Sequence, residues 1–149
     1  METHLVGKTL VFNSRQQLLI LKRSTSDAHR PGGFDVPGGK IDDGEPILDG
    51  AIREALEEAG LVLDASAMRL VYTNAGVGFN ASYGRTLNLG RLQFATLVSE
   101  QEVTLSDEHD SYEWLTIDEV IARTNHPFQK MVLQYIKDNE IVKELWSTP

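Results

Sequence analysis

Three glutamates in the middle of the chain are spaced so that they could hold a metal ion together. Glu54, Glu57 and Glu58 stand at i, i+3 and i+4, which places their carboxylates on one face of a helix. Like charges this close repel each other unless a cation lies among them. Magnesium takes oxygen ligands, usually carboxylates together with substrate phosphates. The spacing therefore indicates a divalent-cation site, although a glutamate-rich helix with an arginine is more often a solvated surface with ion pairs.

The residues around these glutamates predict the helix that positions them. Apolar side chains recur at helical spacing between Pro46 and Ala59. Pro46 suits the first helical position, and Gly60 suits the C-terminal end. Glu45, just before the helix, is not a favoured N-cap residue, so we expect its side chain to have another role. The apolar stripe consists of Leu48, Ala51, Ile52, Ala55 and Ala59.

Residues 38–61 resemble the Nudix box of the Nudix hydrolases. Gly39 is followed after five residues by Glu45 and, after seven more, by the run 53–61, so every fixed position of the box is matched. At Ala55 the family usually has a larger aliphatic residue. The box covers about a sixth of the 149 residues, and seven fixed positions in register make it far more specific than a lone glycine pattern.

The resemblance implies an α/β fold, namely a Nudix-type α/β/α sandwich with a mixed central sheet, and dependence on Mg²⁺ or Mn²⁺. The metal ligands that it implies are the main-chain carbonyl of Gly38 and the side chains of Glu54, Glu57 and Glu58. It also implies an ion pair between Glu45 and Arg53 that fixes the loop against the helix. Gly39, Glu45 and Gly60 would be the structural residues of the box.

A fourth carboxylate lies outside the box. Many Nudix enzymes carry a Glu-His pair a few residues before the last strand, and this chain has Glu108 and His109. The resemblance makes Glu108 a candidate metal ligand or general base, so the base is Glu57, Glu58 or Glu108. We expect His109 to be structural or to face solvent, because a lone histidine is a poor signal for zinc.

Three residues before the box are candidates for substrate binding. Arg23 ends a predicted strand and could contact a phosphate, Phe34 could stack on a base, and Asp35 could read polar edges of that base. Each also has an ordinary alternative, because arginine is common on surfaces, phenylalanine in cores and aspartate at the ends of strands.

The branch of the family is inferred by elimination. ADP-ribose-cleaving members tend to have a proline about fifteen residues after the box, and here no proline lies between Pro46 and Pro127. Dinucleoside-polyphosphate hydrolases tend to have a tyrosine in a similar window, which Tyr72 and Tyr83 flank. The MutT-type branch is therefore favoured, with a (deoxy)nucleoside triphosphate giving a nucleoside monophosphate and pyrophosphate. The alternatives are ADP-ribose, nucleotide-sugar or dinucleoside-polyphosphate hydrolysis, and a non-catalytic nucleotide-sensing module.

Length and composition narrow the remaining choices. We expect residues 1–149 to form a single Nudix domain, acting as a monomer or a homodimer on a small nucleotide. The net charge of −8 argues against a nucleic-acid polymer or an anionic membrane as partner. The absence of cysteine, of a long apolar run and of a signal-peptide pattern leads us to expect a cytoplasmic protein.

Hydrophobic patterning predicts the other elements. We expect a hairpin from 9–12 and 17–22, a strand over 68–73, and a loop or loose hairpin over 74–84. A strand over 86–97 should bulge at Gly90, where the parity of its apolar residues changes. A strand over 113–117 and a short helix over 117–122 should follow. A last helix, with Phe128, Met131, Val132, Tyr135 and Ile136 on one side, should cover the sheet face opposite the glutamate-rich helix.

Overall fold

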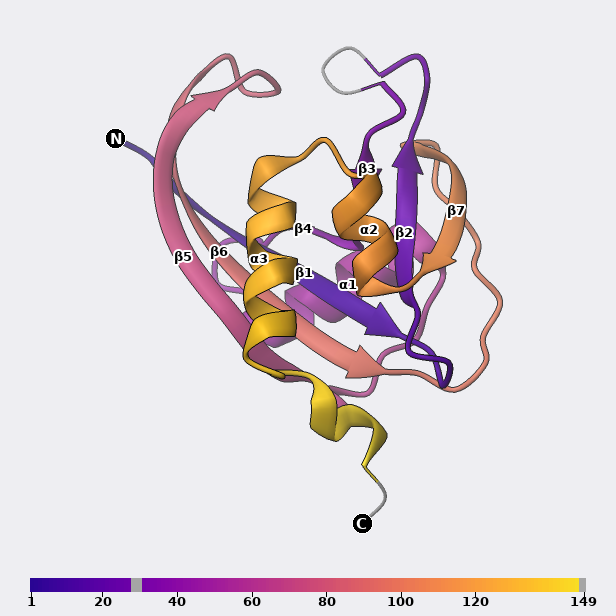
Figure 1. The fold of residues 1–149 in the computed structure, drawn as a ribbon. Helices are drawn as coiled ribbons and strands as arrows, with labels where there is room; N and C mark the ends of the chain where they lie inside the picture. Colours follow the sequence, from indigo (N-terminus) through magenta and orange to yellow (C-terminus); the bar gives the residue numbers. More distant parts are fainter. Residues whose placement is uncertain (28–30, 148–149) are drawn as a thin grey trace.

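The computed structural model describes residues 1–27 and 31–147, and in these residues a mixed seven-stranded sheet lies between helices (Figure 1). The strand order is β3-β2-β1-β6-β5, with β4 paired to β1 and β7 paired to β2. This is the predicted α/β/α sandwich. The elements are β1 (Thr3–Phe12), β2 (Leu18–Arg23), β3 (Phe34–Asp35), β4 (Gly38–Lys40), α1 (Ile47–Ala59), η1 (Ala65–Ala67), β5 (Arg69–Asn80), β6 (Arg85–Leu97), β7 (His109–Leu115), α2 (Ile117–Arg123), α3 (Pro127–Asp138) and η2 (Lys143–Trp146).

Each face of the sheet is covered by its own hydrophobic core. On one face, α3 contributes Val132, Leu133 and Ile136, which pack against side chains of β1 and β2 such as Leu10 and Ile20. On the other face, α1 packs through alanines against Val11, Leu19 and Leu21, the alternate residues of the same strands. The prediction that the glutamate-rich helix and the last helix lie on opposite faces is therefore confirmed.

The small residues of α1 bring its backbone close to the sheet. Ala51 and Ala55 are completely buried. A side chain at Gly7 of β1 would begin 3.0 Å from Ile41 and 3.4 Å from Ala51, so the strand and the helix leave no room between them. Ala55, one turn after Ala51, is fully buried in the same layer with Val11, Leu19 and Leu21, at a position where the family usually has a larger residue.

The predicted hairpin is barely paired. β1 and β2 share the single pair Phe12↔Leu18. On one edge, β1 pairs in parallel with β6 over its whole length, and on the other edge β4 pairs with residues 6–8. Because β4 occupies the edge where a hairpin partner would lie, β2 separates from β1 and pairs instead with β7.

The prediction of a bulge at Gly90 is wrong. Gly90 is in register with both Leu5 of β1 and Ala75 of β5, and the irregularity of the β5–β6 ladder falls between Leu70 and Tyr72. Leu87 and Phe94 are both buried although they point to opposite faces. The change of parity therefore reflects burial on both sides of one regular strand.

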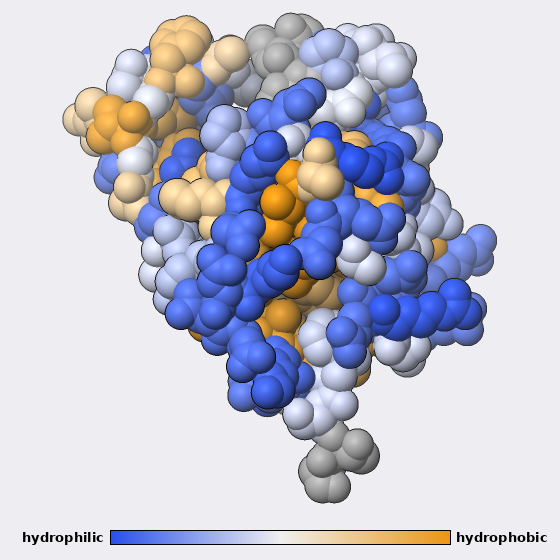
Figure 2. Space-filling view, in the orientation of Figure 1, coloured by the Kyte–Doolittle hydropathy of each residue, from blue (hydrophilic) through white to orange (hydrophobic). Residues whose placement is uncertain are grey.

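The residues predicted as a loop or loose hairpin complete a long two-stranded ribbon. β5 continues to Asn80 and turns directly into β6 at Arg85. The ribbon extends beyond the helices at the upper left of Figure 1, and apolar surface is visible there in Figure 2. The side chains of Val77 and Phe79 are exposed on it.

The other elements agree with the patterns except at their ends. α1 begins at Ile47, with Pro46 as its N-cap rather than its first helical residue. β7 begins at His109 rather than at Glu113, because it pairs with β2 at the edge of the sheet, where polar residues remain exposed. The short helix α2 and the last helix α3 form as predicted. None of the described helices is long and apolar enough to cross a membrane.

Candidate active site

Arg53 of α1 ties the box loop to the helix. Its Nε donates to Glu45 Oε2 at 2.8 Å and its Nη2 to Glu45 Oε1 at 3.0 Å, so the expected ion pair is present and bidentate. The same Nη2 donates to the carbonyl of Lys40 at 3.2 Å. Hydrogen bonds from Arg53 and from the backbone N–H of Asp42 lower the pKa of Glu45 to about 2. The loop is thus held by a carboxylate that stays ionised.

Arg53 also gathers two of the glutamates proposed to bind metal. Its Nη1 lies 3.1 Å from Glu54 Oε1 and 3.2 Å from Glu57 Oε2. Hydrogen bonds to Glu45, followed by those to Glu57 and Glu54, raise the pKa of the guanidinium above its ordinary value. A permanent positive charge therefore offsets the repulsion among these carboxylates on one face of α1.

Two glycines let β4 approach the carboxylates. A Cβ at Gly39 would lie 2.8 Å from the carboxyl carbon of Glu54. Gly38 has φ +150°, and a Cβ there would lie 2.2 Å from the carbonyl oxygen of Gly7. The carbonyl oxygen of Gly38 accepts a hydrogen bond from Lys8 Nζ at 3.4 Å. The glycines thus keep the backbone carbonyl and the Glu54 carboxylate in one small space.

Substituting Gly39 by alanine should reduce activity more than stability. The new methyl group meets the flexible end of Glu54, which can rotate away, so the fold should lose about 1 kcal/mol or less. The displaced carboxylate should lower Mg²⁺-dependent turnover roughly 100-fold, the size of effect expected for a misplacement of about 1 Å. Urea unfolding and steady-state kinetics on the same preparation would check both values.

Gly78→Ala is the matched control, because a Cβ at Gly78 meets nothing within 4 Å. It should leave both turnover and unfolding unchanged. If Gly39→Ala kept wild-type turnover, the packing of Gly39 on Glu54 would have no bearing on the site.

Glu58 lies deeper in the protein than the other two glutamates of the motif. It is 7% exposed, and its Oε2 has no hydrogen-bond partner among the described residues. Burial raises the pKa of Glu58 to about 8, with Lys8 opposing the shift and Asp35, Glu54 and Glu108 adding to it. A buried carboxylate oxygen without a donor is what a cation ligand requires. The donor set of carboxylates and a carbonyl therefore fits a hard divalent cation.

Glu58 should make the metal-free protein less stable as pH rises. Its pKa is higher in the folded chain than in the unfolded chain, so between about pH 4.5 and pH 8 the folded state holds the extra proton. The stability gained from protonated Glu58 is complete below pH 4.5 and is lost as pH rises through 8. The free energy of unfolding should fall by at most about 1.4 kcal/mol per pH unit over this range. Urea unfolding in EDTA across this range would measure it.

Glu58→Gln should remove this slope, because the amide does not titrate. Magnesium should stabilise the wild-type protein more at pH 8 than at pH 6, since a cation favours the ionised carboxylate. A wild-type protein whose stability was flat over this range, or rose with pH, would contradict the assignment.

Asp35 joins three strands next to Glu58. Its carboxylate accepts from Lys8 Nζ of β1 at 3.1 Å and from Arg23 Nη1 of β2 at 3.2 Å, and it lies 3.4 Å from His109 Nε2 of β7. Burial by itself would raise the pKa of Asp35, but Lys8 and His109 outweigh it and hold that pKa well below its usual range. Ligand atoms of Asp35, Glu58 and His109 all lie within 4.8 Å of one another. Because its oxygens already accept hydrogen bonds from the protein, we take Asp35 as an anchor, a residue that holds neighbouring strands together, rather than as a metal ligand.

The structure places the remaining predicted residues differently. Arg23 reaches the cavity described below while also donating to Asp27 at 2.9 Å. Phe34 lies outside that cavity, and its ring centre is 5.8 Å from Lys22 Nζ and 5.4 Å from the guanidinium carbon of Arg123. Glu108 is exposed in the turn just before β7, close enough to raise the pKa of Glu58.

The ring of His109 is fully buried, so the alternative of a solvent-facing histidine is wrong and the structural one holds. Its Nδ1 has no hydrogen-bond partner among the described residues. The pairing of Glu108 and His109 in sequence thus places one side chain at the surface and the other in the interior.

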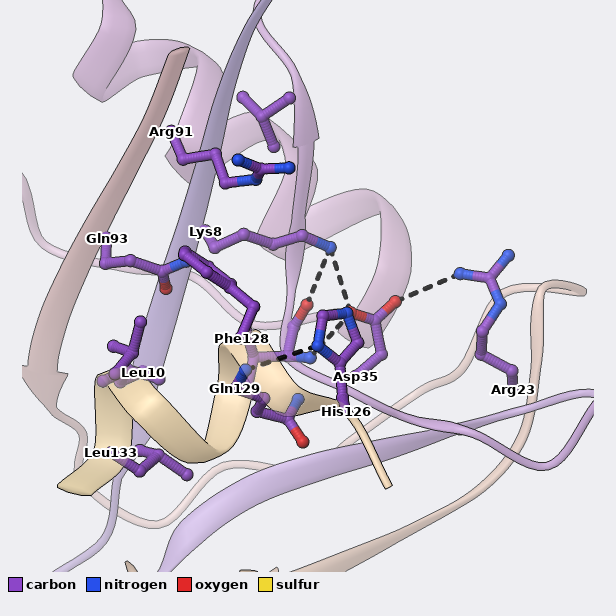
Figure 3. A pocket seen from close by; sticks show the side chains of 13 residues that line it. Lys8, Leu10, Arg23, Asp35, Arg91, Gln93, His126, Phe128, Gln129 and Leu133 are labelled. Carbon is purple, nitrogen blue, oxygen red and sulfur yellow. Dashed lines mark hydrogen bonds and ion pairs between the residues drawn. The ribbon is translucent and has the colours of Figure 1, made fainter. Parts of the chain in front are cut away.

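A cavity of about 200 Å³ adjoins this network, between the sheet and the first turns of α3 (Figure 3). Arg23 and Asp35 were predicted, but Lys8, Arg91 and Gln93 were missed. The sequence could have indicated Lys8, because it lies on the same face of β1 as the apolar residues Val6 and Leu10. A lysine is rarely found at such an inward position. The polar residues that line the cavity are Lys8, Arg23, Asp35, Arg91, Gln93, His126 and Gln129.

Comparisons with known proteins identify the family of the chain. The family model described as NUDIX domain matches residues 4–136. The bis(5'-nucleosyl)-tetraphosphatase [asymmetrical] of Rattus norvegicus is 31% identical over 140 residues, which cover 88% of this chain and 84% of the rat protein. The oxidized purine nucleoside triphosphate hydrolase of Mus musculus is 47% identical over 55 residues, 37% of this chain and 33% of that protein.

Solved structures show the same fold. The MutT protein of Methanosarcina mazei superposes with a TM-score of 0.76 at 22% identity, covering 93% of this chain and 96% of that one. A MutT protein of Bacillus halodurans has a TM-score of 0.72 at 26% identity, covering 89% and 81%. The family match extends from β1 to α3 and includes both the box and the cavity. The chain belongs to the Nudix family, whose members are hydrolases that act on the diphosphate linkages of nucleotides.

Proposed function

We propose that the protein hydrolyses a (deoxy)nucleoside triphosphate to a nucleoside monophosphate and pyrophosphate. In this reaction water adds across one P–O–P linkage: its oxygen bonds to the attacked phosphorus, and the leaving pyrophosphate takes the bridging oxygen. The observation that carries the proposal is the position of the carboxylates of α1 beside a cavity of about 200 Å³. This arrangement provides one place for phosphates and an adjacent place for a single base.

The residues proposed to hold Mg²⁺ or Mn²⁺ are Glu54, Glu57, Glu58 and the Gly38 carbonyl. A divalent cation bound there supplies charge neutralisation at the phosphate oxygens and lowers the pKa of a water. Arg53 keeps Glu54 and Glu57 in place, and Lys8 orients the Gly38 carbonyl. The proton of the attacking water passes to Glu57, Glu58 or Glu108, each of which lies at or near this cluster.

Positive charge at the cavity supports a phosphorylated substrate. Lys8, Arg23 and Arg91 line it, whereas Asp35 is the one carboxylate among the described residues of its lining. This is a local excess of cations in a chain of net charge −8. Phosphoryl transfer depends mainly on positioning and on electrostatic stabilisation, and both are available here.

A dinucleoside polyphosphate is the second candidate substrate. The observation that favours it is the 31% identity to the rat tetraphosphatase over 88% of this chain. The match to the triphosphate hydrolase of Mus musculus has higher identity but is confined to 37% of the chain. The size of the cavity favours a substrate with one base, which is why we place the triphosphate first.

A substrate panel with magnesium tests the proposal. The purified protein would be incubated with each deoxynucleoside triphosphate, ADP-ribose, a nucleotide sugar and diadenosine tetraphosphate, and products would be separated by ion-exchange chromatography. We expect a nucleoside monophosphate and pyrophosphate from a triphosphate. Faster release of ATP and AMP from diadenosine tetraphosphate would favour the second candidate. Tight binding without any turnover would instead indicate a nucleotide-sensing module.

A further inference from the structure

β5 is the outermost strand on one side of the sheet. The strand order places it last, and Figure 1 shows it at the margin of the molecule. Its ladder with β6 is regular over residues 72–80. In an antiparallel pair, the N–H and C=O groups of alternate residues point away from the partner strand. Within residues 1–27 and 31–147, residues 71–79 form no backbone hydrogen bond with a segment other than β6. β5 therefore presents a free edge that another strand could extend.

This edge lacks the features that usually prevent a strand from pairing with another molecule. Natural edge strands carry lysine or proline, or are very short. The fifteen residues from Leu70 to Gly84 contain no charged side chain and no proline, although 24% of the whole chain is charged. By contrast, β7, which pairs with β2, carries Asp110 and Glu113, and β3 has only two residues. Among the described strands, β5 is thus a long edge without such protection.

Apolar side chains flank the edge on both faces of the sheet. Val77 and Phe79 point to one face, and they are 63% and 71% exposed. Tyr72 points to the other face, where its ring lies 5.3 Å from that of Tyr135 of α3, which is 46% exposed. Apolar surface at the ribbon is visible in Figure 2. A strand added to this edge would cover these side chains, and removing apolar surface from water would stabilise the contact.

The sequence of β5 complements itself in an antiparallel register. A twofold axis at Gly76 would set Val77 of one copy opposite Ala75 of the other. The same axis would set Phe79 opposite Thr73. Each larger side chain then meets a smaller one on the same face, and no charged side chains meet. The edge therefore suits a second copy of itself.

We propose that two copies of this chain associate through β5, as antiparallel neighbours in one continuous sheet. Each copy carries a net charge of −8, so most other surfaces bring like charges together, whereas this edge brings none. Nine paired residues span about 30 Å, and with the flanking side chains the contact buries on the order of 1,000 Å² in total. Interfaces of this size are transient, so the dimer dissociates at micromolar concentrations.

Sedimentation equilibrium measures this association directly. Between about 1 and 300 µM, the range for a transient contact, the average mass should rise from 16.6 kDa toward twice that value. A mass of 16.6 kDa at every concentration would overturn the proposal.

Two charged variants at one position test whether β5 is the contact. Val77→Glu and Val77→Lys should each raise the dissociation constant at least about 10-fold, because the axis brings two like charges close together. An equimolar mixture of the two variants should recover the dimer, since opposite charges then lie diagonally across the axis. Val77 is mostly exposed in the single chain, so both variants should keep the unfolding midpoint of wild type.

Val62→Glu is the matched control. Val62 is 69% exposed, similar to Val77, but it lies just after α1 and outside the ribbon. The control should associate as wild type does. Association of Val77→Glu with the wild-type constant would place the contact elsewhere and reject the proposal, as would a mixture of the two charged variants that stays monomeric.

Hydrogen exchange locates the contact without relying on a variant. Amides of residues 72–80 should exchange at least about threefold more slowly at 300 µM than at 1 µM in wild type, and equally fast at both concentrations in Val77→Glu. Concentration-dependent protection confined to another segment, such as β7, would also overturn the proposal. Neither sedimentation nor exchange depends on turnover, so these results are independent of the proposed function.

Discussion

Replacing Glu57 by glutamine is expected to lower kcat with magnesium by roughly 10²- to 10³-fold, the range found when one preorganised electrostatic contact is removed from an active site. Glutamine keeps the shape of the side chain but removes the charge that a hard cation needs. The side chain of Glu57 is 57% exposed and its contact in the structure is the ion pair with Arg53. Exposed pairs contribute about 1 kcal/mol or less, so the fold should be unaffected.

The experiment compares Glu57→Gln with Glu144→Gln at several magnesium concentrations. Glu144 is also about half exposed and is also paired with an arginine, Arg69, but it lies outside α1. We expect the control to match wild type in kcat and in unfolding midpoint. If Glu57→Gln also turned over at close to the wild-type rate at every magnesium concentration, Glu57 would not be a ligand.

Arg53 explains why such a variant can remain folded. It contacts Glu45, Glu54 and Glu57 together, so the acidic face of α1 is partly neutralised before any cation binds. Losing the charge of Glu57 leaves the ion pairs of Arg53 with Glu45 and Glu54 in place, together with its longer pair with Asp42 at 3.6 Å. We therefore expect function to be more sensitive than folding, because the proposed metal site would lose a ligand whereas Arg53 would keep its other partners.

The box and its helix could be predicted because their signals are local. The i, i+3, i+4 spacing of the glutamates and the alanine stripe fall within thirteen residues of one helix. The same holds for α3, whose apolar positions follow helical spacing. In both cases the residues that share a face are fixed by the geometry of a single element.

The cavity could not be predicted in the same way, because it is built from pairings distant in sequence. Lys8 meets Asp35 only because β4, just after Asp35, pairs with β1, and Gln93 reaches the cavity only through the parallel pairing of β1 with β6. Phe34 and Asp35 were both chosen for a base pocket by their place before the box, whereas the cavity is lined by Asp35 and not by Phe34. Neighbouring residues in a strand face opposite sides, so the two side chains do not line the same cavity.

Replacing Asp35 by asparagine is expected to destabilise the protein by about 3–5 kcal/mol, the range for removing one partner of a buried ion pair. Asp35 is 8% exposed and balances Lys8 and Arg23 from two different strands. The neutral amide would leave the Lys8 ammonium without its nearest negative charge and would turn an N–H₂ group toward donors. A loss of this size is a large part of the 5–15 kcal/mol that ordinarily stabilises a domain.

Urea unfolding at pH 7 would measure this loss, with Asp118→Asn as control. Asp118 is also paired with a lysine, Lys137, but is 70% exposed, so the control should change stability by about 0.5 kcal/mol or less. Folding lowers the pKa of Asp35. The stability that its charge contributes is therefore present above the ordinary pKa of an aspartate and is lost as the pH falls below that value. Wild type should therefore lose stability below about pH 4 more steeply than Asp35→Asn does.

Adding Lys8→Met to Asp35→Asn distinguishes an anchor from a simple packing residue. If Asp35 serves mainly to neutralise Lys8, removing both charges should cost clearly less than the sum of the single substitutions, since neither leaves the other buried and unpaired. Additive losses would mean that the carboxylate matters for Arg23 and His109 rather than for Lys8. A loss under 1 kcal/mol for Asp35→Asn alone would show that the three strands are not held together at this residue.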